Sequence, residues 1–344
     1  MRRRDFLVAP VAIFRAEAAK VRLGIDVFSL RSQGWSAFET LDYCARQQVR
    51  VVHFSEPRFL GSLEDEHLKR VAEHARRLGL ELEVGMRSIC PSSKMFDASQ
   101  GPAEQQLARL IRAARLLGSP IARAVLGSAA DRAVPPGIEA HIENLVRVLK
   151  AARAQALEAG VKIAIENHAG DMQARELKTL VEEAGTDFVG VCLDSGNPLW
   201  ALEDPHLSLD TLAPYVLTSH LRDSAVWRVP EGAAVAWVRM GEGNVRIEDW
   251  VRTYLARCPG RTLSLEVIVT APRIFPYYDP AFWDSYRRMP AWEFARFLAL
   301  AEKGRPRPAP PPLSGEAALA REREDLEASL AYTRSLLQQA GAPL

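Results

Sequence analysis

The sequence lacks the features that define several common classes of protein. Its four cysteines (Cys44, Cys90, Cys192 and Cys258) form no CxxC pair and have no histidines at the spacing of a structural zinc site, which predicts buried thiols. No apolar run approaches the roughly eighteen residues that a membrane-spanning helix requires. The formal net charge is only +1, from 44 Lys and Arg against 43 Asp and Glu, so no strong positive field favours a nucleic acid as partner.

A glycine-rich phosphate loop is also missing, because the turn after the first predicted strand reads SLRSQG at residues 29–34, without a GxGxxG motif. From Val21 onward, eight short β-branched runs alternate with longer amphipathic segments, the pattern of repeated βα units around a parallel sheet. We predict strands at residues 22–28, 49–54, 81–86, 121–126, 161–165, 188–193, 216–220 and 262–267. Eight such units without the phosphate loop of an open sheet favour an α/β fold closed into a (β/α)8 TIM barrel.

The segments between the predicted strands carry repeated helix-end signals. Clear helical periodicity covers residues 64–78, 103–117, 139–159 and 175–184, and each of these segments is followed by a glycine. Glycine just past the end of a helix adopts the left-handed cap without strain. The repetition of this signal supports the βα repeat.

Both ends of the chain differ from the predicted barrel, which spans residues 21–304. Residues 1–20 contain consecutive arginines before a short apolar stretch, which is typical of a twin-arginine export signal to the periplasm; the alternative is a basic tail on a cytoplasmic enzyme. Residues 305–344 contain a proline-rich linker and a helix at 316–339. The apolar side of this helix is expected to pack on its own barrel or on a second subunit, and the loop at 270–290 is another candidate contact for a homo-oligomer.

Four successive predicted strands end on a residue that can bind a metal ion: Glu166, Asp194, His220 and Glu266. Neighbouring strands of a barrel bring their C-terminal ends to one side of its mouth, so these side chains are expected to converge. Three carboxylates placed together repel one another unless a positive charge lies between them. An oxygen-rich set with one imidazole suits Mn²⁺, Mg²⁺ or Co²⁺ better than Zn²⁺, and we predict one bound divalent cation.

Five short segments give this pattern a family resemblance. They are IENH at residues 165–168, CLDSGN at 192–197, SHLRD at 219–223, GEG at 241–243 and SLEV at 264–267. Together they resemble the xylose isomerase-like TIM barrels, the sugar phosphate isomerase/epimerase superfamily, over about residues 21–303. The resemblance implies a divalent metal, often manganese, bound by the four residues above, and a sugar or keto-sugar as the small-molecule partner. It also implies a sugar isomerase or epimerase in which Glu166 and Glu266 act as general base and general acid around an enediolate.

Other functions are compatible with such a site. A metal-dependent lyase that eliminates a group from a keto-glycoside is the nearest alternative, because the same site supports elimination. An endonuclease IV-like DNA repair enzyme resembles this fold but uses more metal-binding histidines and a basic surface, which the near-neutral charge does not favour. A non-catalytic sugar-binding barrel is a third alternative.

Six further residues are predicted to contact the substrate: His168, Asn197, Arg222, Arg228, His53 and Glu56. His168 lies two residues after Glu166, so strand alternation points both toward the mouth, where His168 contacts a substrate hydroxyl or another residue of the metal site. Asn197 and Arg222 stand where relatives carry a histidine and a lysine, and these departures leave the identity of the sugar open. Arg228 is a candidate for binding an anionic or polyhydroxylated group. His53 and Glu56 lie at the end of the second predicted strand and are expected to line the pocket.

Two predicted loops, at residues 224–246 and 270–290, are long enough to shape specificity. The second contains six aromatic residues, which either stack on a sugar or pack on one another. The GEG turn at 241–243 is expected to allow a close approach of the backbone to a neighbouring group.

Overall fold

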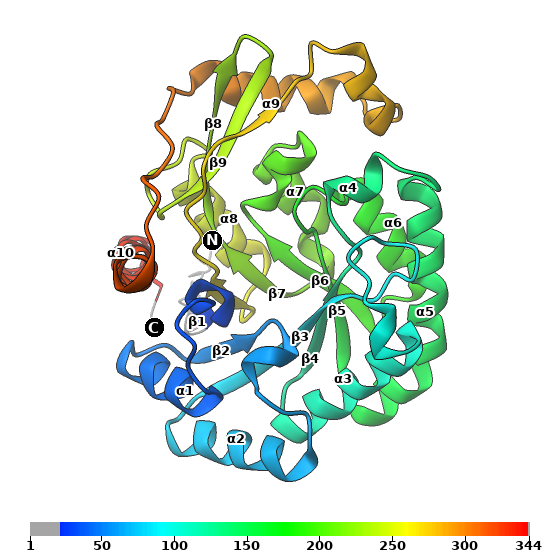
Figure 1. The fold of residues 1–344 in the computed structure, drawn as a ribbon, viewed down its shortest axis with the longest axis vertical. Coiled ribbons are helices and arrows are strands. Elements are labelled where there is room, and N and C mark those ends of the chain that lie inside the picture. The colour runs from blue at the N-terminus through cyan, green and yellow to red at the C-terminus, as the bar shows by residue number, and fades with distance from the viewer. Residues whose placement is uncertain (1–20, 343–344) are drawn as a thin grey trace, which may run out of the picture.

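The computed structural model describes residues 21–342, in which eight parallel strands close into a barrel (Figure 1). The order around the barrel is β1-β10-β7-β6-β5-β4-β3-β2. The strands are β1 (Arg22–Asp26), β2 (Val51–Phe54), β3 (Glu81–Ser88), β4 (Ile121–Val125), β5 (Lys162–Glu166), β6 (Val189–Asp194), β7 (Val216–Leu221) and β10 (Thr262–Leu265). Each coincides with a predicted strand apart from its ends, and the prediction of a (β/α)8 TIM barrel is confirmed. The predicted export signal at residues 1–20 lies outside the described residues.

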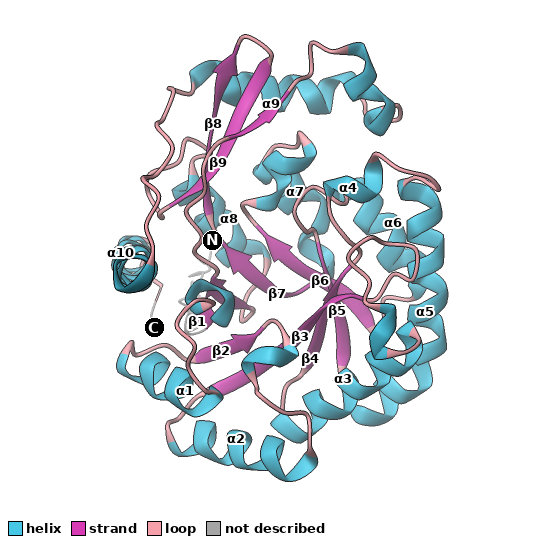
Figure 2. Cartoon of the chain, viewed as in Figure 1, coloured by secondary structure: helices cyan, strands magenta, loops and turns pink. Residues whose placement is uncertain are grey.

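Helices cover the outside of the barrel (Figure 2). They are α1 (Ala37–Arg46), α2 (Asp65–Arg77), α3 (Ala103–Leu117), α5 (Ile138–Ala159), α6 (Ala174–Ala184), α7 (Pro205–Leu212) and α8 (Ile247–Arg257), with the short α4 (Ala129–Arg132) before α5. Helix α3 shows why they form at these places: its buried face includes Leu107, Leu110 and Ile111, and Gly118 ends it in the left-handed conformation at φ +71°. Among the described residues, no helix combines the length and apolar character needed to cross a membrane.

The C-terminal helix α10 (Gly315–Gln339) completes the outer ring of helices. It lies between α8 and α1: Tyr332 contacts Glu248 of α8, and Tyr43 of α1 donates a hydrogen bond to Glu327 at 2.8 Å. Leu330 and its apolar neighbours on the same side are fully buried. Of the two alternatives for this apolar side, the structure therefore shows the helix packed on its own barrel.

Close packing against α10 also explains the GEG turn. Gly241 has φ +85°, and a Cβ atom added there would lie 2.3 Å from Cε2 of Tyr332. A side chain at this position would collide with the ring, and the positive φ angle disfavours every residue other than glycine. The expected close approach is thus observed, and its partner is the C-terminal helix.

The two long predicted loops form a second, smaller sheet above the barrel (Figure 1). Its strands β8 (Asp223–Val229), β9 (Gly232–Val238) and β11 (Arg273–Phe275) are antiparallel in the order β11-β9-β8. The interpretation as loops is therefore wrong for most of the first segment and for residues 273–275 of the second. Helix α9 (Ala291–Lys303) packs against this sheet. The aromatic residues of the second segment pack on one another and on α9, as in the 5.1 Å contact between the rings of Tyr277 and Phe294.

Candidate functional site

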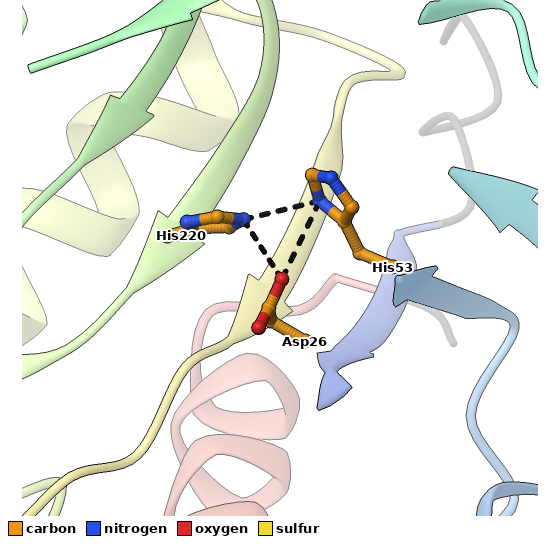
Figure 3. Close-up of side chains that lie close together, drawn as sticks. All are labelled: Asp26, His53 and His220. Carbon is orange, nitrogen blue, oxygen red and sulfur yellow. Dashed lines mark hydrogen bonds and ion pairs between the residues drawn. The ribbon is translucent and has the colours of Figure 1, made fainter. Parts of the chain in front are cut away.

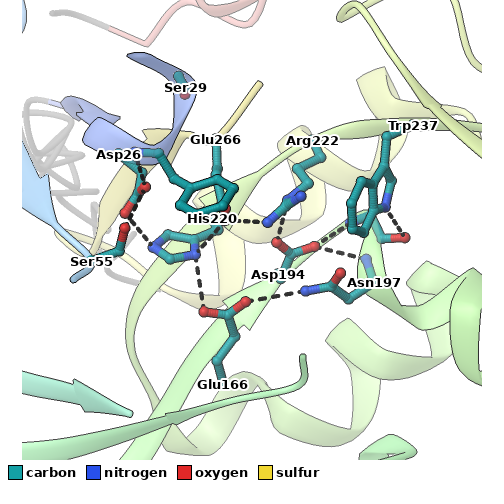
Figure 4. Close-up of polar contacts among 12 residues, drawn as sticks. Asp26, Ser29, Ser55, Glu166, Asp194, Asn197, His220, Arg222, Trp237 and Glu266 are labelled. Atoms are coloured by element: carbon teal, nitrogen blue, oxygen red, sulfur yellow. Dashed lines mark hydrogen bonds and ion pairs between the residues drawn. The ribbon is translucent and has the colours of Figure 1, made fainter. Parts of the chain in front are cut away.

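The four predicted metal ligands meet at the mouth of the barrel. Glu166 and Asp194 are the last residues of β5 and β6, His220 is the last but one of β7, and Glu266 directly follows β10. These strands are successive neighbours in the barrel, and Asp194 pairs in register with His220. One donor atom from each side chain lies within 4.8 Å of the others, and all four residues are buried (Figure 4). The structure therefore brings together side chains that are up to a hundred residues apart in the chain.

Two buried guanidinium groups lie among these carboxylates. Arg222 Nε donates to Asp194 Oδ2 at 2.7 Å, and Nη2 of the same side chain contacts Glu266 Oε2. Arg123, in the middle of β4, donates from Nε to Glu166 Oε2 at 2.6 Å. The positive charge that offsets repulsion between the carboxylates thus comes in part from the chain itself.

Neighbouring positive charges determine the ionisation of the two glutamates. Burial raises the pKa of a carboxyl group, but at Glu166 the charges of Arg123 and His220 together outweigh burial and hold the pKa well below the usual range. At Glu266, burial is outweighed by Arg222 and His220 together, which lower the pKa to about 2. Both glutamates are therefore ionised at neutral pH and available as ligands or as proton acceptors.

Two buried polar side chains contact the Nε2 atom of His220, on the side of the ring opposite the two glutamates (Figure 3). Its Nε2 lies 3.2 Å from Asp26 Oδ2 and 3.0 Å from His53 Nδ1, and none of the three side chains is exposed to solvent. Its Nδ1 lies on the other side, 3.1 Å from Glu166 Oε2 and 2.9 Å from Glu266 Oε2. Burial lowers the pKa of His220, but the surrounding acidic groups outweigh burial and raise the pKa well above its ordinary value, so the ring holds a hydrogen on both nitrogens. A cation bound at Nδ1 would take the place of the hydrogen that faces the two glutamates. A carboxylate behind the ring is the usual arrangement at a metal-bound histidine.

The donor set fits a divalent cation. His220 Nδ1 is buried and makes no well-aligned hydrogen bond among the described residues, although two carboxylate oxygens lie at 3.1 Å or less. Buried polar atoms rarely lack a partner, so an unpartnered nitrogen that faces carboxylates is consistent with a cation between them. Carboxylate oxygens with one imidazole are ligands that Mn²⁺, Mg²⁺ and Co²⁺ accept.

A cavity of about 480 Å³ adjoins the metal residues, and Glu266, Arg123 and His168 line it directly. Its volume lies within the range of small-molecule pockets, roughly 300 to 1,000 Å³. The other lining residues are Phe28, Ser55, Glu56, Arg58, Arg87, Met95, Val125, Trp237 and Ile268. The cavity therefore provides room for a sugar-sized molecule next to an ionised glutamate.

Two of the predicted substrate contacts line this cavity, and a third contacts a metal residue. Glu56 and His168 line it. The Nδ1 atom of His168 lies 2.7 Å from the Gly127 carbonyl oxygen, and because a carbonyl only accepts, Nδ1 is the donor. Burial lowers the pKa of this histidine, so the ring is neutral and its Nε2 is a hydrogen-bond acceptor. Asn197 donates from Nδ2 to Glu166 Oε1 at 3.1 Å, and the amide at this position therefore contacts a metal residue.

The other three predicted contacts have different surroundings. His53 lies behind His220 and is not among the residues that line the cavity. Arg222 contacts two of the metal residues, and its guanidinium lies 4.4 Å from the ring centre of Trp237. Trp237 lines the cavity, and Arg222 is not among the lining residues. Arg228 is exposed at the end of β8, where it contacts Tyr278 and lies 3.7 Å from Glu302.

The structure adds residues that the sequence reading did not select. Asp26 ends β1 as Asp194 ends β6, so the same strand-end signal could have identified it. Arg123 is a charged residue inside the apolar strand IARAV, and a buried charge at such a position demands a carboxylate partner. No sequence pattern indicated that Trp237 lies at the site, because its segment was interpreted as a loop.

Comparisons with known proteins agree with this architecture. The family model of the xylose isomerase-like TIM barrel matches residues 31–276. YihM, an uncharacterized protein of Escherichia coli strain K12, is 22% identical over 318 residues, which cover 88% of this chain and 85% of that protein. The 3-oxo-isoapionate decarboxylase of Pectobacterium atrosepticum is 24% identical over 188 residues, which cover 55% of this chain and 61% of that enzyme. A solved D-psicose 3-epimerase of Clostridium cellulolyticum H10, with D-tagatose, has a TM-score of 0.61 at 15% identity, covering 92% of this chain and 99% of that one.

Proposed function

Because the chain belongs to the xylose isomerase-like TIM barrel family, we propose that it is a divalent-metal-dependent sugar isomerase or epimerase that works through an enediolate. The observation that carries the proposal is a buried group of two ionised glutamates, an aspartate and a histidine whose donor atoms lie close enough to hold a metal ion, beside a cavity of sugar size. The structural likeness to a D-psicose 3-epimerase supports the same reaction class.

Glu166, Asp194, His220 and Glu266 would bind the cation, and their mostly oxygen donors favour Mn²⁺ over Zn²⁺. A bound cation polarises the carbonyl group of a sugar and stabilises the negative charge that develops when a neighbouring proton leaves.

The protein side chains then move the proton. Glu166 or Glu266 accepts it from the carbon next to the carbonyl, and the electron pair of the C–H bond passes into the enediolate. Epimerisation requires a proton on the opposite face: the other glutamate takes a proton from solvent and delivers it to that face, which inverts the carbon, and the first glutamate releases its proton to solvent. Return of the proton to the neighbouring carbon gives aldose–ketose isomerisation. Arg123 and Asn197 contact the two oxygens of Glu166 and so fix the direction of its carboxylate, while His168 Nε2 accepts a hydrogen bond from a substrate hydroxyl.

A metal-dependent lyase is the second candidate function. The observation that favours it is the 24% identity to 3-oxo-isoapionate decarboxylase, although the matched region is under two thirds of that enzyme. The same cation and the same ionised glutamates would serve such a reaction, because loss of a group next to a ketone also passes through an enolate.

Deuterium exchange tests the proposal. Manganese-loaded protein is incubated in D₂O with ketoses, aldoses and 3-keto-glycosides, and NMR locates any deuterium that enters a sugar. We expect deuterium at a carbon next to the carbonyl group, together with an epimer or isomer of the sugar. A lyase would instead show the signals of a fragment or of an unsaturated product in the same spectra.

Variants assign the exchange to the proposed residues. Glu166→Gln and Glu266→Gln should each abolish exchange, because the amide neither accepts the proton nor binds the cation as well. Glu302→Gln is the matched control, since Glu302 is exposed on α9 and its nearest charged partner is Arg228 at 3.7 Å. If deuterium exchange survives in both Glu166→Gln and Glu266→Gln, the proposed mechanism is wrong.

A further inference from the structure

Three arginines line the cavity beside the metal residues: Arg58, Arg87 and Arg123. Two acidic side chains, Glu56 and Glu266, line the same space. Arg123 is already paired inside the metal site, and Arg58 donates from Nε to Glu56 Oε2 at 2.6 Å. Arg87 has no ion pair and no side-chain hydrogen bond among residues 21–342. Its guanidinium group is therefore the uncommitted positive charge of this cavity.

The local backbone presents Arg87 at the cavity. Strand β3 leaves its regular register with β4 between Gly85 and Ser88, so that two residues, Met86 and Arg87, stand against one residue of β4. An extra residue of this kind is a β-bulge, a feature that re-aims side chains and occurs often beside active sites. Arg87 is the exposed residue of a strand that is otherwise buried or half-buried.

The charge of Arg87 is felt at Asp97, but the two side chains form no ion pair. Asp97 lies in the loop after β3, and its Oδ1 accepts hydrogen bonds from the backbone N of Ser99 at 3.0 Å and from the Ser99 hydroxyl at 2.6 Å. Asp97 therefore caps its own turn, and it forms no ion pair with Arg87. A guanidinium group offers a planar set of donors that matches the two oxygens of a carboxylate or the oxygens of a phosphate.

The geometry points to an oxyanion subsite at Arg87, so that the sugar that reaches the metal residues also carries a carboxylate or phosphate group. This inference rests on the proposed function for the sugar part of the ligand. The preference for an anion is a property of binding alone and does not depend on catalysis.

Calorimetric titration of the full chain tests the subsite with three related probes: D-gluconate, D-glucose 6-phosphate and D-glucose. We expect at least one of the two anions to bind about tenfold more tightly than glucose, the gain of one charge-assisted contact. A tighter complex with gluconate identifies a carboxylate as the preferred group, and a tighter complex with the phosphate ester identifies a phosphate. Each titration is run on manganese-loaded and on metal-free protein, because anions also bind manganese.

Substitution of Arg87 separates the subsite from other causes of anion binding. Arg87→Met retains the length of the side chain and should remove the preference for the anion while the dissociation constant of glucose stays within about twofold. Arg87→Lys retains the charge without the planar donor set and should give an intermediate preference. Arg261→Met is the matched control: Arg261 is exposed just before β10, at the opposite end of the strands, and its loss changes the net charge equally.

Three outcomes would overturn the inference: no preference for either anion in the wild-type protein, a preference that persists in Arg87→Met, or an equal loss in Arg87→Met and Arg261→Met. Failure of the proposed reaction gives a different result. In that case no deuterium enters any sugar, yet the preference that depends on Arg87 is still measured. Thermal unfolding of each variant confirms that the exposed substitution leaves the fold intact.

Discussion

Arg222 donates from Nε to Asp194 Oδ2 at 2.7 Å, which places a positive charge of the chain against a residue that is proposed to bind the metal. The same guanidinium contacts Glu266. Because like charges repel, Arg222 opposes the binding of a divalent cation by these two carboxylates. We therefore expect Arg222→Met to bind Mn²⁺ about tenfold more tightly than the wild type, which corresponds to roughly 1.4 kcal/mol.

Calorimetric titration of Mn²⁺ measures this effect. Arg222→Lys retains a positive charge at the same place and serves as the control, for which little tightening is expected. Since Arg222→Met leaves a buried carboxylate without its partner, its melting temperature should also rise more on addition of Mn²⁺ than that of the wild type. Equal or weaker binding of Mn²⁺ by Arg222→Met would show that the arginine assists the cation instead of opposing it.

The contact behind His220 leads to a second prediction. Asp26 lies 3.2 Å from Nε2 of this histidine, and removal of such a carboxylate typically weakens metal binding by about 10- to 100-fold. Asp26→Ala should therefore weaken the binding of Mn²⁺ to this extent in the same titration. The control is Asp42→Ala, because Asp42 contacts His74 at 2.7 Å on the surface and away from the metal residues. If both variants bind Mn²⁺ equally well, Asp26 has no role in orienting His220.

The packing of α10 on the barrel predicts its contribution to stability. Leu330 is fully buried, and Leu330→Ala should lower the free energy of unfolding by about 2–5 kcal/mol through lost contacts and the cavity left behind. Leu157→Ala makes the same substitution at a residue that is 45% exposed on α5, where we expect a change within about 0.5 kcal/mol. Denaturant unfolding compares the two. Similar small losses would mean that α10 is not an integral part of the barrel.

A buried carboxyl group outside the set of metal residues predicts a dependence of stability on pH. Burial raises the pKa of Glu203 from its ordinary value to about 8, although Ser208 and the backbone N of Ala174 donate to it. Below the ordinary pKa, both the folded and the unfolded state hold the proton, and the stabilising effect is complete. As the pH rises toward about 8, the unfolded state releases the proton first, so stability falls by at most ~1.4 kcal/mol per pH unit.

Glu203→Gln should remove this contribution, so its free energy of unfolding should fall less than that of the wild type between about pH 5 and pH 8. The comparison uses the slope of the unfolding free energy against pH. The substitution also changes hydrogen bonds, but their loss affects the free energy equally at low and at high pH. Glu104→Gln, at an exposed position of α3, is the control and should retain the wild-type slope. Parallel slopes for wild type and Glu203→Gln would contradict the prediction.

Part of the site could be predicted from the sequence because it depends on local pattern. Glu166, Asp194 and Glu266 each stand at the end of a short apolar run, and strand ends of a parallel barrel meet at one mouth. The segments that became β8 and β9 were interpreted as loops because they lie between two barrel strands, where the repeat predicts a connection. They form a sheet because β8 pairs with β9 and β9 pairs with β11, about forty residues along the chain, and local periodicity does not reveal the second pairing.

By itself, the sequence determined the eight barrel strands, the helices between them and the convergence of four metal-competent residues, since each follows from periodicity over a few residues and from the geometry of closed parallel sheets. Only the tertiary structure decided which positive charges lie among the carboxylates, which helix closes the ring and which arginine is left uncommitted. Arg123 and Arg222 each find a carboxylate on another strand, and Arg87 does not. Those relationships depend on distances between segments far apart in the chain, and such distances exist only once the barrel has closed.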